Sequence, residues 1–224
     1  MLQRISNSRL FNLLSGVIPA VFFFLLVRTE ANRLFIILNR SELAGTEAQF
    51  YSYVTLSFSK ILFMSLIIAL FVVRRQPVRK TEGIMPRLTA IAGSFMMFLL
   101  VLCPAQPPSM LQSGIGMLLV IVGSVFSIVS VATLGRSFSI MAEARRLVTH
   151  GVYSIVRHPL YLAEEIAVLG IVVQVFSVPA VLLLAFHVAI QVQRMGNEEA
   201  VLMKAFPEYE TYMVHTSRLI PSVY

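Results

Sequence analysis

The polar residues best suited to chemistry lie between two apolar stretches, in residues 147–162. This segment contains Gly151 and the triplet Arg157-His158-Pro159. Glycine tolerates a positive φ or a close backbone approach, and proline fits the first turn of a helix, whose free amides and dipole attract anions. Arg157 and His158 would add hydrogen-bond donors beside that helix start. The segment therefore predicts a binding position for a carboxylate or a phosphate.

A second polar group begins at Arg194 and includes the adjacent Glu198 and Glu199. A guanidinium can orient a carboxylate through a bidentate pair, and a glutamate can hold hydroxyl or ammonium groups. Each of these residues, considered alone, could also have a purely structural role. Arg157 with His158 fits a pair at the membrane edge, and Arg194 with Glu198 fits an ordinary i,i+4 helix pair.

Together, the two groups resemble the sequence pattern of the isoprenylcysteine carboxyl methyltransferase family. The first match is the string Leu147-Val-Thr-His-Gly-Val-Tyr153 followed by Arg157-His-Pro-Leu-Tyr161. The second match is a C-terminal series made of Arg194, Glu198, Glu199, Leu202, Phe206, Glu208, Tyr209, Tyr212, Arg218 and Pro221. Two linked motifs at the family's separation are far more specific than either motif alone.

The resemblance implies a membrane methyltransferase without a Rossmann core, holding S-adenosylmethionine at the cytoplasmic boundary. The sequence has no glycine-rich dinucleotide fingerprint, which agrees. The resemblance assigns the catalytic residues as Arg157, Arg194 and Glu198. It assigns cofactor binding to Leu147, Val148, His150, Gly151, Tyr153, His158, Pro159, Tyr161 and Glu199. The acceptor, a small or lipid-like carboxylate, thiol or amine, would enter from the bilayer between helices.

The chain departs from the family just after Tyr161. The family usually has a glycine and apolar or aromatic residues there, whereas this chain has Glu164 and Glu165. Carboxylates in the first turns of a membrane helix are unfavourable unless they face a polar cavity or the N-terminal dipole. Either one glutamate lines the acceptor site and shifts the substrate from an anionic prenylcysteine toward an amine or thiol, or both are simply favoured by the dipole.

The composition places these groups in a membrane protein. Of the residues, 57% are hydrophobic and 13% are charged, against about 25% charged in soluble domains. The mean hydropathy is +0.81, and a membrane-crossing helix needs about 20 mainly apolar residues. Uncharged or nearly uncharged runs occur at Leu10–Val27, Phe50–Val73, Leu88–Gly135 and Ile166–Gln193.

Prolines divide two of these runs into pairs of helices. Pro104, Pro107 and Pro108 interrupt Leu88–Gly135, since proline removes backbone donors and ends helices. The second division is a tight hairpin, with helices expected at Tyr161–Phe176 and Val178–Arg194. We therefore expect an all-α fold, a polytopic transmembrane helical bundle of about six spans, ending in a cytoplasmic C-terminal helical segment.

Positive charge sets the expected topology of this bundle. Segments 74–87 and 136–157 are rich in arginine and should face the cytoplasm, as should both termini. We expect one integral membrane domain, in which residues 1–135 form four transmembrane helices without evident chemistry. Residues 136–224 would form the cofactor-binding loop, the helical hairpin and the C-terminal helical segment.

Several other functions are disfavoured by the sequence. The net charge of +7 comes from basic residues spread between apolar segments, which fits membrane lipid head groups better than nucleic acid. Cys103 is the only cysteine, so an intramolecular disulfide is excluded. His150 and His215 lack the spacing of a metal site. His187, inside an apolar helix, fits either a hydrogen-bonded core histidine or a pathway residue.

The favoured function is therefore methyl transfer from S-adenosylmethionine to an acceptor at the membrane. Two alternatives stay open at this stage. One is an NADPH-dependent membrane reductase, because the C-terminal part also resembles that of sterol reductases. The other is a non-catalytic membrane protein. Binding of S-adenosylhomocysteine or NADPH would separate the three.

Overall fold

The computed structural model describes residues 9–40, 42, 45, 47–104 and 108–221. The chain divides into two compact units, Met1–Arg74 and Arg75–Tyr224, here called the N-terminal and C-terminal units. The described residues form seven α-helices and two very short strands. The expected helical fold is thus confirmed.

Three helices are long and apolar enough to cross a membrane, at Leu56–Val73, Met110–Ser137 and Val178–Ala205. Large apolar side chains such as Leu118, Leu182 and Phe186 are more than 60% exposed, as expected for surfaces that face lipid. These features agree with a multi-pass integral membrane protein. Six spans and cytoplasmic termini stay predictions.

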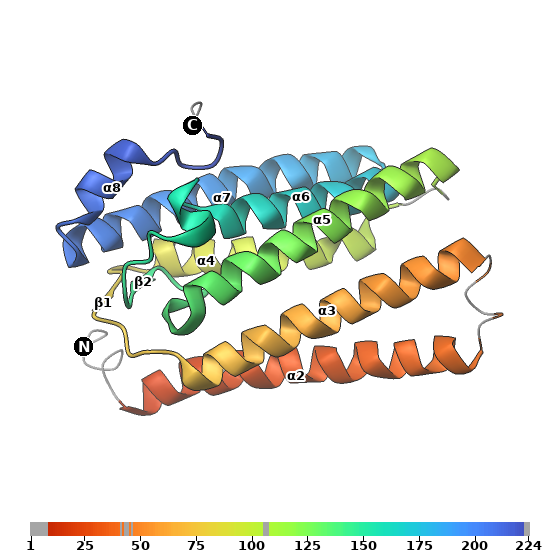
Figure 1. Ribbon diagram of the computed structural model, residues 1–224, viewed down its shortest axis with the longest axis horizontal. Helices are drawn as coiled ribbons and strands as arrows, with labels where there is room; N and C mark the ends of the chain where they lie inside the picture. The colour runs from red at the N-terminus through yellow and green to blue at the C-terminus, as the bar shows by residue number, and fades with distance from the viewer. Residues whose placement is uncertain (1–8, 41, 43–44, 46, 105–107, 222–224) are drawn as a thin grey trace. The chain divides into compact units, whose positions relative to one another are not determined.

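The N-terminal unit is a hairpin of α2 (Arg9–Asn39) and α3 (Glu47–Val73), drawn in red and orange in Figure 1. The buried Ser57 hydroxyl donates a hydrogen bond of 2.8 Å to Glu30, and Lys60 lies 3.5 Å from the same carboxylate. The uncharged run Leu10–Val27 ends well before the helix does. Helix α2 continues to Asn39 because charge alone does not end a helix and residues 28–39 contain neither glycine nor proline.

The C-terminal unit contains five α-helices (Figure 1). They are α4 (Met85–Phe95, continued by the 3₁₀ segment η2, Met96–Leu102), α5 (Met110–Leu134), α6 (Pro159–Gln174), α7 (Val178–Ala205) and α8 (Tyr209–His215). The expected division of Leu88–Gly135 into two helices is confirmed. A capping box of Ser109 and Gln112 begins α5, in which each side chain bonds the other residue's backbone amide.

The helical hairpin is confirmed, but its second arm is longer than expected. Helix α6 ends at Gln174 and α7 begins at Val178. Helix α7 runs past Arg194 to Ala205, since the residues that follow Arg194 are mostly good helix formers. This extension keeps both glutamates of the C-terminal motif on a regular helix.

Glycines bring α5 and α6 into close contact. A Cβ atom added at Gly123 would lie 2.5 Å from the backbone nitrogen of Ala167 and 2.7 Å from the carbonyl oxygen of Ala163. A Cβ at Gly170 would lie 2.6 Å from the carbonyl oxygen of Gly116. Small residues let helix backbones approach in this way. The contact fixes α6, whose first turn carries the site, against α5.

We expect Gly123→Ala to lower the thermal stability of the purified protein in detergent, because the new methyl group meets backbone atoms that cannot rotate away. Overpacking of this kind costs about 1–3 kcal/mol. Gly114→Ala, in the same helix, is the matched control, since a Cβ there meets nothing within 4 Å. Alanine is also the better helix former. Equal melting temperatures for the two variants would contradict the packing argument.

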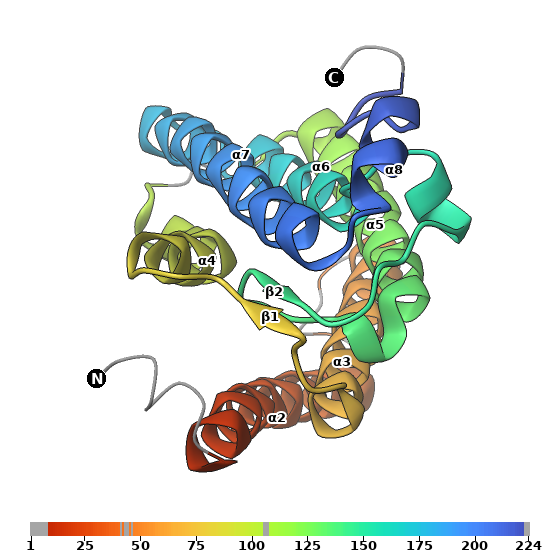
Figure 2. The same ribbon diagram turned by 90° about the vertical axis from the view of Figure 1, so that its left-hand side faces the viewer.

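Short irregular elements gather at one end of the C-terminal unit, which faces the viewer in Figure 2. Strand β1 (Arg79–Lys80) pairs antiparallel with β2 (Glu143–Ala144), and the 3₁₀ turns η3 (Gly135–Ser137) and η4 (Gly151–Ser154) lie in the chain between α5 and α6. At this end α4 and α6 begin while α5 and α7 finish (Figure 1). The polar motifs of both groups therefore meet here.

Candidate functional site

The Arg-His-Pro loop is held in place by the C-terminal segment through backbone contacts. Val156 forms a parallel β-bridge with Ser217. The Arg157 amide donates to the Ser217 carbonyl at 2.8 Å, and the His158 amide donates to the Arg218 carbonyl at 3.1 Å. Two segments that are far apart in the sequence thus lie side by side directly before α6. Pro159 is buried in the first turn of α6.

Glu199 is the centre of the charged network between this loop and α7. Its carboxylate lies 3.0 Å from Arg157 Nε and 3.1 Å from His158 Nε2, and it also pairs with the guanidinium of Arg218. The side chains of Glu199 and His158 are each 4% exposed. A buried carboxylate is stable only when it is paired and hydrogen-bonded. Glu199 therefore joins the loop, α7 and the C-terminal segment from within the protein.

Arg157 extends this network to the end of α8. Its Nη1 donates to the carbonyl oxygens of Met213 at 2.8 Å and Thr216 at 2.6 Å. These bonds use a planar guanidinium as a rigid fork between Glu199 and two backbone acceptors. The side chain is only 11% exposed. Arg157 is thus committed largely to protein contacts.

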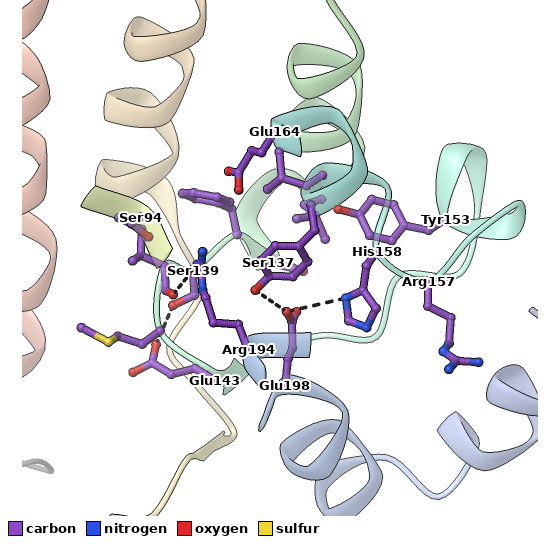
Figure 3. Close-up of a pocket in the computed structure, with 16 residues that line it drawn as sticks. Ser94, Ser137, Ser139, Glu143, Tyr153, Arg157, His158, Glu164, Arg194 and Glu198 are labelled. Carbon is purple, nitrogen blue, oxygen red and sulfur yellow. Dashed lines mark hydrogen bonds and ion pairs between the residues drawn. The ribbon is translucent and has the colours of Figure 1, made fainter. Parts of the chain in front are cut away.

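Glu198 has a different environment from its neighbour. Its carboxylate accepts a hydrogen bond of 3.1 Å from the Tyr161 hydroxyl and lies 4.0 Å from His158 Nδ1. The side chain is 35% exposed, and Figure 3 shows it pointing into the pocket toward His158. Adjacent residues on a helix point about 100° apart. Glu198 can therefore meet a ligand where Glu199 cannot.

Two adjoining pockets share a wall at this end of the unit. The wall consists of Leu134, Ser137, Glu143, Tyr153, Arg157, His158 and Glu198. The first, here the loop pocket, is completed by Arg145, Arg146, Leu147, Val148, Leu202, Tyr209 and Tyr212. The second, here the helix pocket and drawn in Figure 3, is completed by Ser94, Phe138, Ser139, Ile140, Met141, Leu160, Tyr161, Glu164 and Arg194. The site is therefore bipartite.

A buried polar chain crosses the helix pocket from α7 to α6. Arg194 Nη1 donates to Gln191 Oε1 at 2.7 Å, and Gln191 Nε2 donates to Glu164 Oε2 at 3.0 Å. The guanidinium carbon also lies 4.9 Å from the centre of the Tyr161 ring, a cation–π contact. Among the described residues, the Arg194 Nε has no partner and no ion pair joins Arg194 to Glu198.

A second polar pair lies outside both pockets. His187 is 2% exposed, with Nε2 3.0 Å from the Gly93 carbonyl and Nδ1 2.8 Å from Glu165. A carbonyl oxygen only accepts, so Nε2 carries a proton. His187 is therefore a hydrogen-bonded core histidine that joins α4, α6 and α7. Glu165 is its partner rather than part of the helix pocket.

Tyrosines form the far side of the loop pocket. Burial raises the pKa of Tyr153 and Tyr209, and it raises the pKa of Tyr212 to about 12. All three hydroxyls therefore stay protonated donors at physiological pH. The Tyr212 hydroxyl donates to the Tyr153 carbonyl at 2.5 Å. The Tyr209 hydroxyl is buried and has no hydrogen-bond partner in the described part of the chain, so it is a donor that a bound group could satisfy.

Most of the residues predicted from the sequence come together in this region. Leu147, Val148, Tyr153, Arg157, His158, Tyr161, Arg194 and Glu198 line one or both pockets. His150 is exposed and lines neither pocket. Gly151 has a φ of 61°, so its role is in the turn. Pro159 and Glu199 are buried behind the lining.

Sequence reasoning gave no role to Gln191, Tyr209 or Tyr212, although both tyrosines belong to the matched C-terminal series. A signal for Gln191 was present. His187, Gln191, Arg194 and Glu198 follow one another at intervals of four, three and four, which places them along one face of a helix. A polar stripe in an otherwise apolar helix predicts a buried polar contact.

Comparisons with known proteins agree with the motif positions. Residues 111–209 match the family model described as phospholipid methyltransferase. The chain is 36% identical over 99 residues to a cobalt-zinc-cadmium resistance protein of Cupriavidus metallidurans, covering 42% of this chain and 45% of that protein. It is 32% identical over 133 residues to protein-S-isoprenylcysteine O-methyltransferase A of Arabidopsis thaliana, covering 55% of this chain and 66% of the plant protein.

A nickel-cobalt-cadmium resistance protein of Alcaligenes xylosoxydans is also similar, at 30% identity over 98 residues and 46% of its length. The chain thus spans less than half of the two resistance proteins and 66% of the plant enzyme. The family match contains α6, α7 and the Arg-His-Pro loop. Residues 111–209 of this chain thus match the phospholipid methyltransferase family, and protein-S-isoprenylcysteine O-methyltransferases are among the chain's relatives.

Proposed function

We propose that this protein is a membrane-bound methyltransferase that transfers a methyl group from S-adenosylmethionine to a small or lipid-like acceptor at the cytoplasmic membrane face. The main support is the contact between the two sequence motifs. His158 meets Glu199 at 3.1 Å, and Tyr161 meets Glu198 at 3.1 Å. These contacts surround two adjoining pockets, as a reaction between two bound molecules requires.

The loop pocket suits the chemical groups of S-adenosylmethionine. Apolar Leu147, Val148 and Leu202 can cover an adenine ring, and the partly exposed Glu198 can accept hydrogen bonds from hydroxyl or ammonium groups. The exposed Arg146 can pair with a carboxylate. The unpartnered Tyr209 hydroxyl supplies one further donor. When bound, this cofactor supplies an electrophilic methyl group on a sulfonium.

The helix pocket would hold the acceptor. Methyl transfer depends mainly on holding two reactants in line and excluding water. Arg194, with its unpartnered Nε, and Glu164 line this pocket. Arg157 is occupied by Glu199 and two carbonyl oxygens, so we assign it to positioning His158 and α8. Arg194 is then the arginine that meets the acceptor.

Cofactor binding tests this proposal directly. We expect the purified protein to bind S-adenosylhomocysteine saturably in isothermal titration and not to bind NADPH. Incubation with radiolabelled S-adenosylmethionine and a membrane lipid extract should transfer label to an extractable fraction. Saturable NADPH binding alone would favour the reductase, and binding of neither compound would favour a non-catalytic protein.

We expect His158→Ala to weaken S-adenosylhomocysteine binding about tenfold or more, equal to about 1.4 kcal/mol, because His158 lines both pockets and contacts Glu198 and Glu199. His150→Ala is the matched control, since His150 is exposed and lines neither pocket. Its affinity should equal that of the unaltered protein. An equal loss of S-adenosylhomocysteine affinity in both variants would contradict the assigned positions.

A further inference from the structure

We propose that Glu164 selects the methyl acceptor by taking its proton, so that the acceptor is a neutral nucleophile with a transferable hydrogen, a thiol or an amine, and not a carboxylate. This inference rests on the proposed methyltransferase function. It gives a role to one of the two glutamates by which the chain departs from the family pattern.

The position of Glu164 supports this role. The residue lies on α6, lines the helix pocket and is partly exposed there. Figure 3 shows Glu164, Arg194 and Glu198 around the same pocket. Gln191, which is 2% exposed, holds one Glu164 oxygen at 3.0 Å with its amide nitrogen. A carboxylate fixed in this way has a defined direction toward a bound molecule.

The charges of the helix pocket disfavour an anionic acceptor. Gln191 also accepts a hydrogen bond of 2.7 Å from Arg194, so a single buried amide joins the arginine to Glu164. The positive charge of Arg194 is therefore already offset by a neighbouring carboxylate. A carboxylate acceptor placed beside Arg194 would be repelled by Glu164 and by Glu198. A neutral thiol or amine would meet no such repulsion.

The chemistry of the transfer gives Glu164 a use only with a protic acceptor. A carboxylate acceptor is already deprotonated and needs no base. With a thiol or an amine, the bond from sulfur or nitrogen to the methyl carbon forms while the sulfonium carbon–sulfur bond breaks, and its electron pair returns to sulfur. The acceptor proton moves to a Glu164 carboxylate oxygen. The products are the methylated acceptor, S-adenosylhomocysteine and a protonated Glu164, which later releases the proton to water.

Glu165 provides a natural comparison within the same helix turn. It has the same charge and side chain, but it pairs with His187 and lies outside the residues that line the two pockets. Glu165→Gln removes the same charge as Glu164→Gln and keeps an oxygen for the His187 contact. A general electrostatic effect on α6 would act on both variants, whereas proton acceptance would act on one.

The experiment uses the full chain in lipid nanodiscs with three probes that share a twelve-carbon tail: dodecanethiol, 4-dodecylaniline, which is an amine that is uncharged at neutral pH, and dodecanoate. Binding of each probe is first measured without cofactor, and methyl transfer is then measured with S-adenosylmethionine. We expect transfer to a protic probe and not to dodecanoate. Glu164→Gln should reduce kcat for the protic probe about 100-fold or more, the usual effect of losing a general base. It should also tighten dodecanoate binding about tenfold, while Glu165→Gln changes neither value.

A more acidic aromatic thiol with the same tail separates proton acceptance from a structural effect. Because this probe loses its proton more easily, Glu164→Gln should reduce its methylation less than that of dodecanethiol. An equal loss for both thiols overturns the assignment. Transfer to dodecanoate alone, unchanged kcat in Glu164→Gln, or no transfer to either protic probe by a protein that binds S-adenosylhomocysteine also overturns it. Absence of S-adenosylhomocysteine binding would instead reject the proposed function itself.

Discussion

Replacing Glu199 with alanine should unfold or strongly destabilise the C-terminal unit, because it removes a counter-charge of Arg157 and Arg218 and the hydrogen-bond partner of His158 Nε2. Breaking one partner of a buried pair costs about 3–5 kcal/mol, and Arg157 and His158 are 11% and 4% exposed. The loop would lose its contacts with Glu199 on α7, although its backbone bonds to Ser217 and Arg218 would remain. The measurement is the thermal unfolding temperature in detergent.

Glu198→Ala is the matched variant, because it removes the same group from the adjacent residue. Glu198 is 35% exposed, and we expect its loss to change stability by less than about 1 kcal/mol. The protein should remain folded but lose affinity for S-adenosylhomocysteine. If instead Glu199→Ala kept the unfolding temperature of the unaltered protein and Glu198→Ala unfolded, the roles assigned to the two carboxylates would be wrong.

The meeting of the two motif groups was predictable from the sequence, but the separate roles of the two glutamates were not. Spacing along the chain relates Glu198 and Glu199 equally to the Arg-His-Pro loop. Which carboxylate turns inward depends on the rotation of α7 about its own axis, and α7 packs against α4, α6 and β2. Glu164 and Glu165 repeat the same ambiguity on α6, where one meets Gln191 and the other meets His187.

Apolar runs and prolines predicted which helices form, but they did not predict where these helices end. The apolar runs end near Arg28 and Arg194, where charged residues begin, yet α2 and α7 continue beyond these positions. Helix formation needs backbone hydrogen bonds and suitable residues rather than apolar side chains. Hydropathy therefore indicates how much of a helix can lie within a bilayer. Capping and helix-breaking residues determine where the helix itself begins and ends.

Arg194→Gln should abolish most methyl transfer while leaving cofactor affinity nearly unchanged. Arg194 lines the helix pocket and does not line the loop pocket, so its loss acts on the acceptor. A small misplacement of a reactant can lower kcat about 100-fold, and Arg194 also holds Glu164 in place through Gln191. The measurements are kcat with a methylated probe and the Kd of S-adenosylhomocysteine. Arg194→Lys should recover only part of the loss, since an ammonium cannot reproduce the planar contacts with Gln191 and the Tyr161 ring.

Two further variants make this test specific. A Cβ atom at Gly93 would lie 2.5 Å from Arg194 Cδ, so Gly93→Ala should displace the guanidinium without removing it and cause a smaller loss of the same kind. Gln193→Ala changes an exposed neighbour on α7 and should leave both values unaltered. Because Gly93 lies on α4, a shared kinetic defect in Gly93→Ala and Arg194→Gln would link α4 to the acceptor through the arginine. A drop in cofactor affinity in either variant would show that the two pockets are not separate in function.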